Sequence, residues 1–166
     1  MLKFSGMNSR HAHKLWQGGA DDFGNRPETS VSDGSGNPCR HCLKMIQKGE
    51  RFMILSYRPF DELQPYAEQG PVFLHAEPCE SFQAQVDPDQ TTKLPAVLCD
   101  SSHYLMRGYD ARQRTVYGSG TIVEKDKIKT VADTLLAEPS IEFIHVRSST
   151  NNCWQARIDA CDSGDQ

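Results

Sequence analysis

Two pairs of potential metal ligands lie in the first half of the sequence. Cys39 and Cys42 are separated by two residues, and His75 and Cys79 by three. Cysteines at this spacing on a tight turn can point at one ion, and three thiolates with one imidazole are a standard tetrahedral zinc set. The sequence therefore predicts one structural zinc ion bound by Cys39, Cys42, His75 and Cys79, in a knuckle similar to that of treble-clef modules.

Two other interpretations of the cysteines remain open. Cys99 and His103 have the same spacing as the second pair and are an alternative source of the last two ligands. The CxxC motif is also found at thioredoxin-type redox sites, but there it begins a helix within a βαβ unit. Here the residues after Cys42 lead to Gly49 and a predicted strand. Zinc is favoured because both pairs have the spacing of ligands.

A second group of chemically active residues lies on two predicted β-hairpins. Alternate strand residues share a face, so His145 and Arg147 continue an apolar face that begins with Ile141 and Phe143. A histidine and an arginine in this position indicate a cleft that binds an anion such as a phosphate or a carboxylate. The ligand-binding candidates are Arg107, Tyr109, Asp110, His145, Arg147, Asn152 and Cys153.

These hairpin residues allow a bolder and a plainer interpretation. In the bolder one, Cys153 is a nucleophile and His145 is its base, which requires the two side chains to lie within hydrogen-bond distance. In the plainer one, the arginines form ion pairs on the sheet surface and the asparagines only form the turn.

The elements that position the hairpin residues follow from apolar patterning. Residues 103–109 and 114–118 predict a hairpin with its turn at 110–113. Residues 127–137 predict a helix with one apolar face, which Pro139 ends. Residues 141–147 and 153–159 predict a second hairpin.

The first half is less regular. Residues 9–17 predict a short helix with Ser9 as its N-cap, and residues 51–57 and 72–75 predict strands. Residues 21–38 are rich in Gly, Asn, Asp and Ser and predict a long polar loop. Residues 86–95 predict a second connecting loop.

The order of these elements favours an α+β fold, because regular βαβ alternation is missing. We predict a mostly antiparallel sheet with one main helix packed on a face, and an irregular N-terminal part that contains the metal knuckle. The expected organisation is a single domain over residues 1–166. Its parts are a helix and polar loop at 1–38, a metal-knuckle region at 39–85 and a hairpin–helix–hairpin core at 96–160.

Composition limits the possible partners. A formal charge of −4 on 166 residues disfavours non-specific nucleic-acid binding, which needs a basic surplus. No apolar run is long enough for a membrane helix or a signal peptide, so we expect a cytoplasmic protein and no membrane partner. Cytoplasmic cysteines are kept reduced, which again favours metal ligation over disulfides.

Several segments together resemble the bacterial family catalogued as domain of unknown function 1203. The resemblance runs from about Gly36 to Ala160 and is carried by residues 36–40, 49–50, 70–73, 107–110, 144–147 and 152–158. The family has no established activity, so the resemblance implies no substrate. It does imply that zinc belongs to members with the full Cys/His set and is structural, because members often lack equivalents of Cys42 and His75.

Two functions are consistent with these features. The first is a zinc-stabilised binding module whose ligand is a protein or a small anion. The alternative is a small enzyme or anion-binding protein with a pocket formed by His145, Arg147, Asn152 and Cys153.

Overall fold

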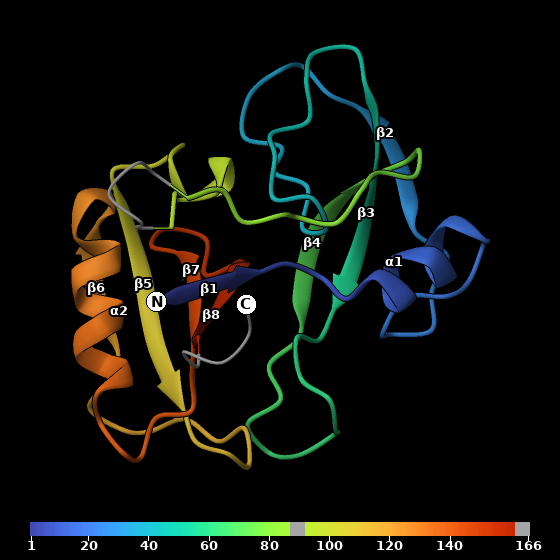
Figure 1. The fold of residues 1–166 in the computed structure, drawn as a ribbon. Helices are drawn as coiled ribbons and strands as arrows, with labels where there is room; N and C mark the ends of the chain where they lie inside the picture. Colours follow the sequence, from blue (N-terminus) through green and yellow to red (C-terminus); the bar gives the residue numbers. More distant parts are fainter. Residues whose placement is uncertain (87–91, 162–166) are drawn as a thin grey trace. The chain divides into compact units, whose positions relative to one another are not determined.

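The computed structural model describes residues 1–86 and 92–161 and contains antiparallel sheets with one main helix, which confirms the predicted α+β class (Figure 1). Contacts within the chain divide it into two compact units. Unit 1 comprises Met1–Ser5 and Gln83–Gln166, and unit 2 comprises Gly6–Phe82. The expectation of one domain across the whole chain stays a prediction.

Unit 1 is built on a five-stranded antiparallel sheet in the order β1-β8-β7-β5-β6. The N-terminal strand β1 lies beside β8, close to the other end of the chain, as the blue and red arrows of Figure 1 show. Its strands are β1 (Leu2–Ser5), β5 (His103–Tyr109), β6 (Thr121–Glu124), β7 (Phe143–Ser148) and β8 (Trp154–Ala160). The helices of unit 1 are α2 (Ile128–Leu136) and two 3₁₀ turns, η1 (Ala96–Leu98) and η2 (Lys125–Lys127).

The two faces of this sheet differ in chemistry. On one face, alternate positions carry buried apolar side chains, including Phe4, Met106, Ile144 and Ile158. The buried residues of α2 are also apolar and match this face in chemistry. The helix contacts β1, β6, β7 and β8. The opposite face carries aromatic and charged side chains, including Tyr109, His145 and Arg147.

Unit 2 contains a three-stranded antiparallel sheet, in the order β2-β3-β4, and one short helix. The helix α1 (Ser9–Trp16) buries Ala12 and Leu15, and the side chain of Asn8 caps it by accepting a hydrogen bond from the Arg10 amide. The strands are β2 (Glu28–Val31), β3 (Arg51–Tyr57) and β4 (Gly70–His75).

The polar stretch 21–38 is more ordered than its composition predicts. The buried Asp21 carboxylate accepts hydrogen bonds from the amides of Phe23, Asn25 and Ser56, which fixes the start of this stretch against β3. Further on, β2 pairs with β3 as an edge strand, and all four of its residues are exposed. Neither feature produces an apolar pattern, so the sequence did not reveal them.

The first predicted hairpin is corrected by the structure. The next strand in the chain that pairs with β5 is β6 at residues 121–124, whereas residues 114–118 contribute only an isolated bridge between Tyr109 and Thr115. Asp110 causes the difference, because its Oδ1 accepts hydrogen bonds from the amides of Arg112 and Arg114 and closes a loop there. The second hairpin, β7–β8, forms as predicted.

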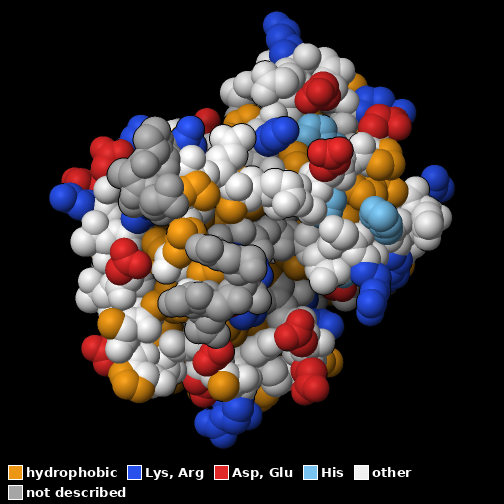
Figure 2. All heavy atoms as spheres, in the orientation of Figure 1, with side chains coloured by type: hydrophobic (Ala, Val, Ile, Leu, Met, Phe, Trp, Pro, Cys, Tyr) orange, Lys and Arg blue, Asp and Glu red, His pale blue; other side chains and the backbone are white. Residues whose placement is uncertain are grey.

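No helix in the described part of the chain has the length and apolar character that a membrane crossing requires. On the face drawn in Figure 2, acidic and basic side chains are interspersed. Residues 87–91 of the second predicted loop lie outside the described residues, and Val86 and Thr92 form a bridge.

Candidate metal centre and the polar sheet face

The first ligand pair sits on a tight turn. The Cys39 amide donates to the carbonyl of Lys44, and the Leu43 amide donates to the carbonyl of Cys39, at 2.9 and 3.1 Å. Leu43 closes the turn in the left-handed region, with φ 52°. Its side chain is fully buried, which offsets the cost of a conformation that favours glycine. The turn buries both Cys39 and Cys42.

The second ligand pair is supplied by β4 and the segment that follows it. His75 is the last residue of β4, and Cys79 lies four residues further on. The turn is joined to β4 because the Arg40 amide donates to the Phe73 carbonyl, at 2.9 Å. The Phe82 amide donates to the His41 carbonyl, at 3.1 Å, and so returns the chain after Cys79 to the same turn.

The four predicted ligands come together within unit 2. Their ligand atoms all lie within 4.8 Å of one another. Cys39 Sγ is 3.8 Å from Cys79 Sγ, and Cys42 Sγ is 3.6 Å from His75 Nδ1. In a regular tetrahedron with ordinary zinc bond lengths, the sulfur–sulfur and sulfur–nitrogen edges are about 3.8 and about 3.6 Å. The cluster therefore has the size of a tetrahedral metal site.

Crowding three thiols and an imidazole perturbs their protonation. Hydrogen bonds from Cys42 and Cys79 hold the pKa of Cys39 far below its ordinary value, while Cys39 and Cys42 raise the pKa of Cys79 strongly. Hydrogen bonds with Cys39 and Cys42 also raise the pKa of His75 to about 10. The site therefore retains protons, because several neighbouring thiolates would repel one another. A bound divalent cation would replace these protons as the compensating positive charge.

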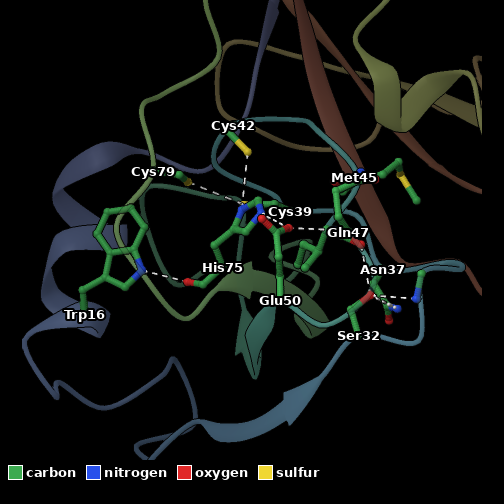
Figure 3. A network of polar contacts seen from close by, with 12 residues as sticks. Trp16, Ser32, Asn37, Cys39, Cys42, Met45, Gln47, Glu50, His75 and Cys79 are labelled. Atoms are coloured by element: carbon green, nitrogen blue, oxygen red, sulfur yellow. Dashed lines mark hydrogen bonds and ion pairs between the residues drawn. The ribbon is translucent and has the colours of Figure 1, made fainter.

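Groups around the ligands fix their orientation (Figure 3). Glu50 Oε2 lies 3.4 Å from His75 Nε2, on the side of the ring away from Cys42, and accepts a hydrogen bond from the Gln47 amide. Trp16 Nε1 of α1 donates to the His75 carbonyl, at 2.8 Å. A carboxylate on the second nitrogen of a ligating histidine is the usual support of a metal site.

His41 is a further contact of the cluster. Its ring is buried, with Nδ1 3.4 Å from Cys79 Sγ and Nε2 2.9 Å from Ser9 Oγ. Burial lowers the pKa of His41, so the ring is neutral and can share a hydrogen bond with the sulfur. Sequence spacing drew attention to the ligands but gave no sign of Glu50 or His41, because their roles depend on the tertiary fold.

The polar face of the five-stranded sheet gathers several of the predicted ligand-binding residues. The strand register places Arg107, His145 and Arg157 in one row across β5, β7 and β8. Two further rows flank it, and they consist of Tyr109, Phe143 and Asp159 on one side and Leu105, Arg147 and Trp154 on the other. Sequence reasoning missed Trp154 and Asp159 here.

His145 is the centre of this face and is fully buried. Its ring centroid lies 4.7 Å from that of Tyr109, 5.2 Å from that of Phe143 and 5.9 Å from that of Trp154. Burial, followed by the charges of Arg147, Arg157 and Arg107, lowers the pKa of His145 well below its ordinary value. The ring is therefore neutral at pH 7.

Other candidates lie away from this centre. The Ser148 amide donates to the Cys153 carbonyl, so Cys153 stands three residues along β7 from His145, a separation of about 10 Å. The structure therefore does not bring the thiol within hydrogen-bond distance of the imidazole. Asn152 contributes its backbone carbonyl, which accepts from Arg147 Nη1 at 3.1 Å, and Asp110 belongs to the β5–β6 loop.

The alternative metal pair does not form a comparable cluster in the described residues. Cys99 and His103 are exposed, and neither joins a group of three or more potential ligands among residues 1–86 and 92–161. Cys99 Sγ contacts the Pro95 carbonyl, and His103 Nδ1 contacts Ser102 Oγ.

Comparison with known proteins identifies the family and nothing further. The model of a family described as "Protein of unknown function (DUF1203)" matches residues 36–160, which is most of the chain. The protein therefore belongs to this family, and both the metal cluster and the polar sheet face lie inside the matched region. Comparisons with curated proteins and with solved structures found no significant match.

Proposed function

We propose that this protein is a binding module whose unit 2 is held together by one structural zinc ion. The observation that carries the proposal is the cluster of four ligand atoms within 4.8 Å of one another, in which the Cys39–Cys79 and Cys42–His75 distances of 3.8 and 3.6 Å match the edges of a zinc tetrahedron. When bound, zinc supplies a fixed cross-link between the ligands and no reaction of its own.

The donor set favours a structural metal over a catalytic one. Catalytic zinc sites keep a coordination position open for water or substrate, whereas four protein ligands close the tetrahedron. Cys39 and Cys42 are buried, and Glu50 and Trp16 restrain His75 from two sides. Sulfur-rich tetrahedral sites also suit zinc better than oxygen-preferring cations.

Metal analysis of protein purified without chelators and without a histidine tag tests the proposal. We expect one zinc ion per chain in the wild type and loss of that ion in Cys42→Ser. The matched control is Cys99→Ser, because this exposed cysteine lies outside the cluster and its variant should keep the zinc. Wild-type protein with no bound metal, or with iron in place of zinc, contradicts the proposal.

The role as a binding module is supported by the separation of the two features. A closed metal site has no position for a ligand, so the surface that recognises a partner must lie elsewhere. On the polar face of the five-stranded sheet, the half-buried Arg107 and Arg157 are side chains of a kind suited to recognition.

A further inference from the structure

The three sulfur ligands of the metal cluster differ in their exposure to solvent. Cys39 and Cys42 are buried, with 0% and 5% of their surface exposed, whereas Cys79 is half-buried and lies beyond the end of β4. A thiolate reacts with a dissolved oxidant only where the oxidant can reach the sulfur. Cys79 is therefore the sulfur ligand that a reagent arriving from solvent meets first.

A second thiol stands directly beside Cys79. Cys39 Sγ lies 3.8 Å from Cys79 Sγ, although the two residues are 40 apart in the sequence (Figure 3). The backbone at Cys39 is already docked on β4, because Cys39 forms a bridge with Phe73 and the Arg40 amide donates to the Phe73 carbonyl. A disulfide needs a sulfur–sulfur distance of about 2.05 Å. The pair therefore has to close by less than about 2 Å, which rotation of the two side chains and a small shift of the segment after β4 can supply.

The third thiol of the cluster has a different neighbour. Cys42 Sγ lies 3.6 Å from His75 Nδ1, and Glu50 restrains that ring from its other nitrogen. Cys42 is thus placed against an imidazole that is held in position, while Cys39 and Cys79 present their sulfurs to each other. The arrangement favours Cys39 over Cys42 as the thiol that reacts with an oxidised Cys79.

We propose that Cys79 is a site of oxidation by hydroperoxides, and that Cys39 completes the reaction by forming a disulfide with it, which releases the metal. In the first step the Cys79 thiolate attacks one oxygen of hydrogen peroxide. The S–O bond forms, the O–O bond breaks, and the departing hydroxide takes a proton from solvent and leaves as water. In the second step the Cys39 thiolate attacks the Cys79 sulfur, so the S–S bond forms, the S–O bond breaks and a second hydroxide leaves as water with a second solvent proton. The two thiolates together lose two electrons, and these reduce the peroxide to two waters.

The disulfide links the same two segments that the metal links. Its sulfurs no longer carry the thiolate charge that holds a divalent cation, and Cys42 and His75 alone are too few ligands to retain zinc. Cys39 in the β2–β3 connection and Cys79 after β4 stay joined, now by a covalent bond. Oxidation therefore releases the metal and still leaves unit 2 cross-linked. The release of zinc rests on the proposed function, whereas the reactivity of the thiol pair does not.

Treatment of the full-length, zinc-loaded protein with a small molar excess of hydrogen peroxide tests the proposal. A chromophoric chelator follows the free zinc, and peptide mapping after alkylation of the remaining thiols identifies the bridge. We expect release of the zinc and a Cys39–Cys79 disulfide, both of which dithiothreitol with added zinc reverses. A bridge that involves Cys42, or irreversible sulfinic acid without a bridge, overturns the inference.

Two variants locate the reaction. Cys79→His keeps a standard set of four zinc ligands, two cysteines and two histidines, but removes the half-buried thiol. Peroxide should release its zinc about tenfold more slowly or less, because the remaining ligand thiols are buried. The matched control is the double variant Cys99→Ser/Cys153→Ser, which removes two thiols outside the cluster and should release zinc at the wild-type rate. Equal rates for the two variants contradict the site. If Cys79→His does not bind zinc, the peptide map of the wild type decides alone.

Hydrogen exchange tests whether the disulfide takes over the link. Oxidised, metal-free protein should keep the protection of β3 and β4, and loss of this protection on oxidation contradicts a cross-link between the two segments.

Two more outcomes separate this inference from the zinc proposal. Zinc-loaded protein that keeps both its metal and its thiols in peroxide overturns the oxidation site and leaves the zinc site standing. Protein purified without metal in which peroxide still joins Cys39 to Cys79 supports the thiol pair and contradicts the zinc proposal.

Discussion

The two units of this protein are built by different means. In unit 1, every residue of β7 from Phe143 to Arg147 is buried, and a helix supplies apolar residues to the sheet. In unit 2, β2 is exposed along its whole length, and a cluster of three cysteines and a histidine lies where β4 meets the Cys39–Cys42 turn. The stability of unit 1 depends on burial of apolar surface. The stability of unit 2 also depends on contacts that join segments distant in the sequence.

The difference shows what a metal adds to a segment with few regular elements. Unit 2 joins α1 and its three strands by long irregular connections, each of which must be ordered at an entropic cost. A metal held by Cys39 and Cys42 in the β2–β3 connection, and by His75 and Cys79 at and after the end of β4, constrains these two segments at once, so binding energy becomes folding energy. Unit 1 has shorter hairpin connections and a continuous core, and needs no such constraint.

The largest expected effect is on unit 2 when the metal is removed. A chelator should abolish hydrogen-exchange protection in β3 and β4, because structural zinc contributes about 10 kcal/mol or more to the folding of small zinc modules. Protection in β5, β7 and β8 should persist, since no ligand of the cluster belongs to unit 1. Hydrogen exchange read by mass spectrometry measures both units in one sample, and equal loss of protection in both contradicts the comparison.

The opposite perturbation is a cavity in unit 1. Ile144→Ala removes a fully buried side chain from the middle of the sheet and should destabilise unit 1 by about 2–5 kcal/mol. Zinc content and protection of β3 should remain unchanged. Ile122→Ala is the control, because this residue of β6 is 56% exposed and its loss should cost less than about 0.5 kcal/mol. Denaturant unfolding of both variants, with metal analysis, makes the measurement.

This difference between the units also decided what the sequence could predict of the fold. Unit 1 owes its form to apolar periodicity, so the sequence predicted β5, α2, β7 and β8 to within two residues at each end. It missed β1 and β6, short edge strands whose pairing partners are distant or displaced by the Asp110 loop. In unit 2 the apolar strand β3 was predicted, whereas β2 lacks a pattern and forms only by pairing with it.

The metal ligands were predictable because ligand spacing is a local property of the sequence, and the structure brings all four together. Their supports were not, since Glu50 reaches His75 only after β3 pairs with β4. Only some of the residues that share the polar face were predicted to lie together. Strand periodicity joined His145 to Arg147, but the row with Arg107 and Arg157 depends on the order of strands. The hypothesis of a Cys153 nucleophile required hydrogen-bond distance to His145, and the position of Cys153 opposite Ser148 does not provide it.

A milder change to the metal centre is Glu50→Gln. Loss of the carboxylate beside His75 Nε2 should weaken zinc binding about 10–100-fold, the usual effect of removing such a support. Competition with a chromophoric chelator measures the affinity. Glu62→Gln, which changes an exposed glutamate of the same unit, should leave it unaltered. If the two variants bind zinc equally well, Glu50 does not orient the ligand.

The smallest expected effect belongs to unit 1 and depends on pH. The pKa of buried His145 is lowered in the folded protein, whereas in the unfolded chain it returns to about 6.5. Below that value the unfolded chain takes up a proton that the folded protein refuses, so stability falls as pH falls. Between pH 7.5 and pH 5.5 the loss should reach about 1 kcal/mol. His145→Phe should remove that loss from the protection of β7 and β8, while His103→Gln, at an exposed position of the same sheet, should retain it. An unchanged pH dependence in His145→Phe would mean that another group carries the proton.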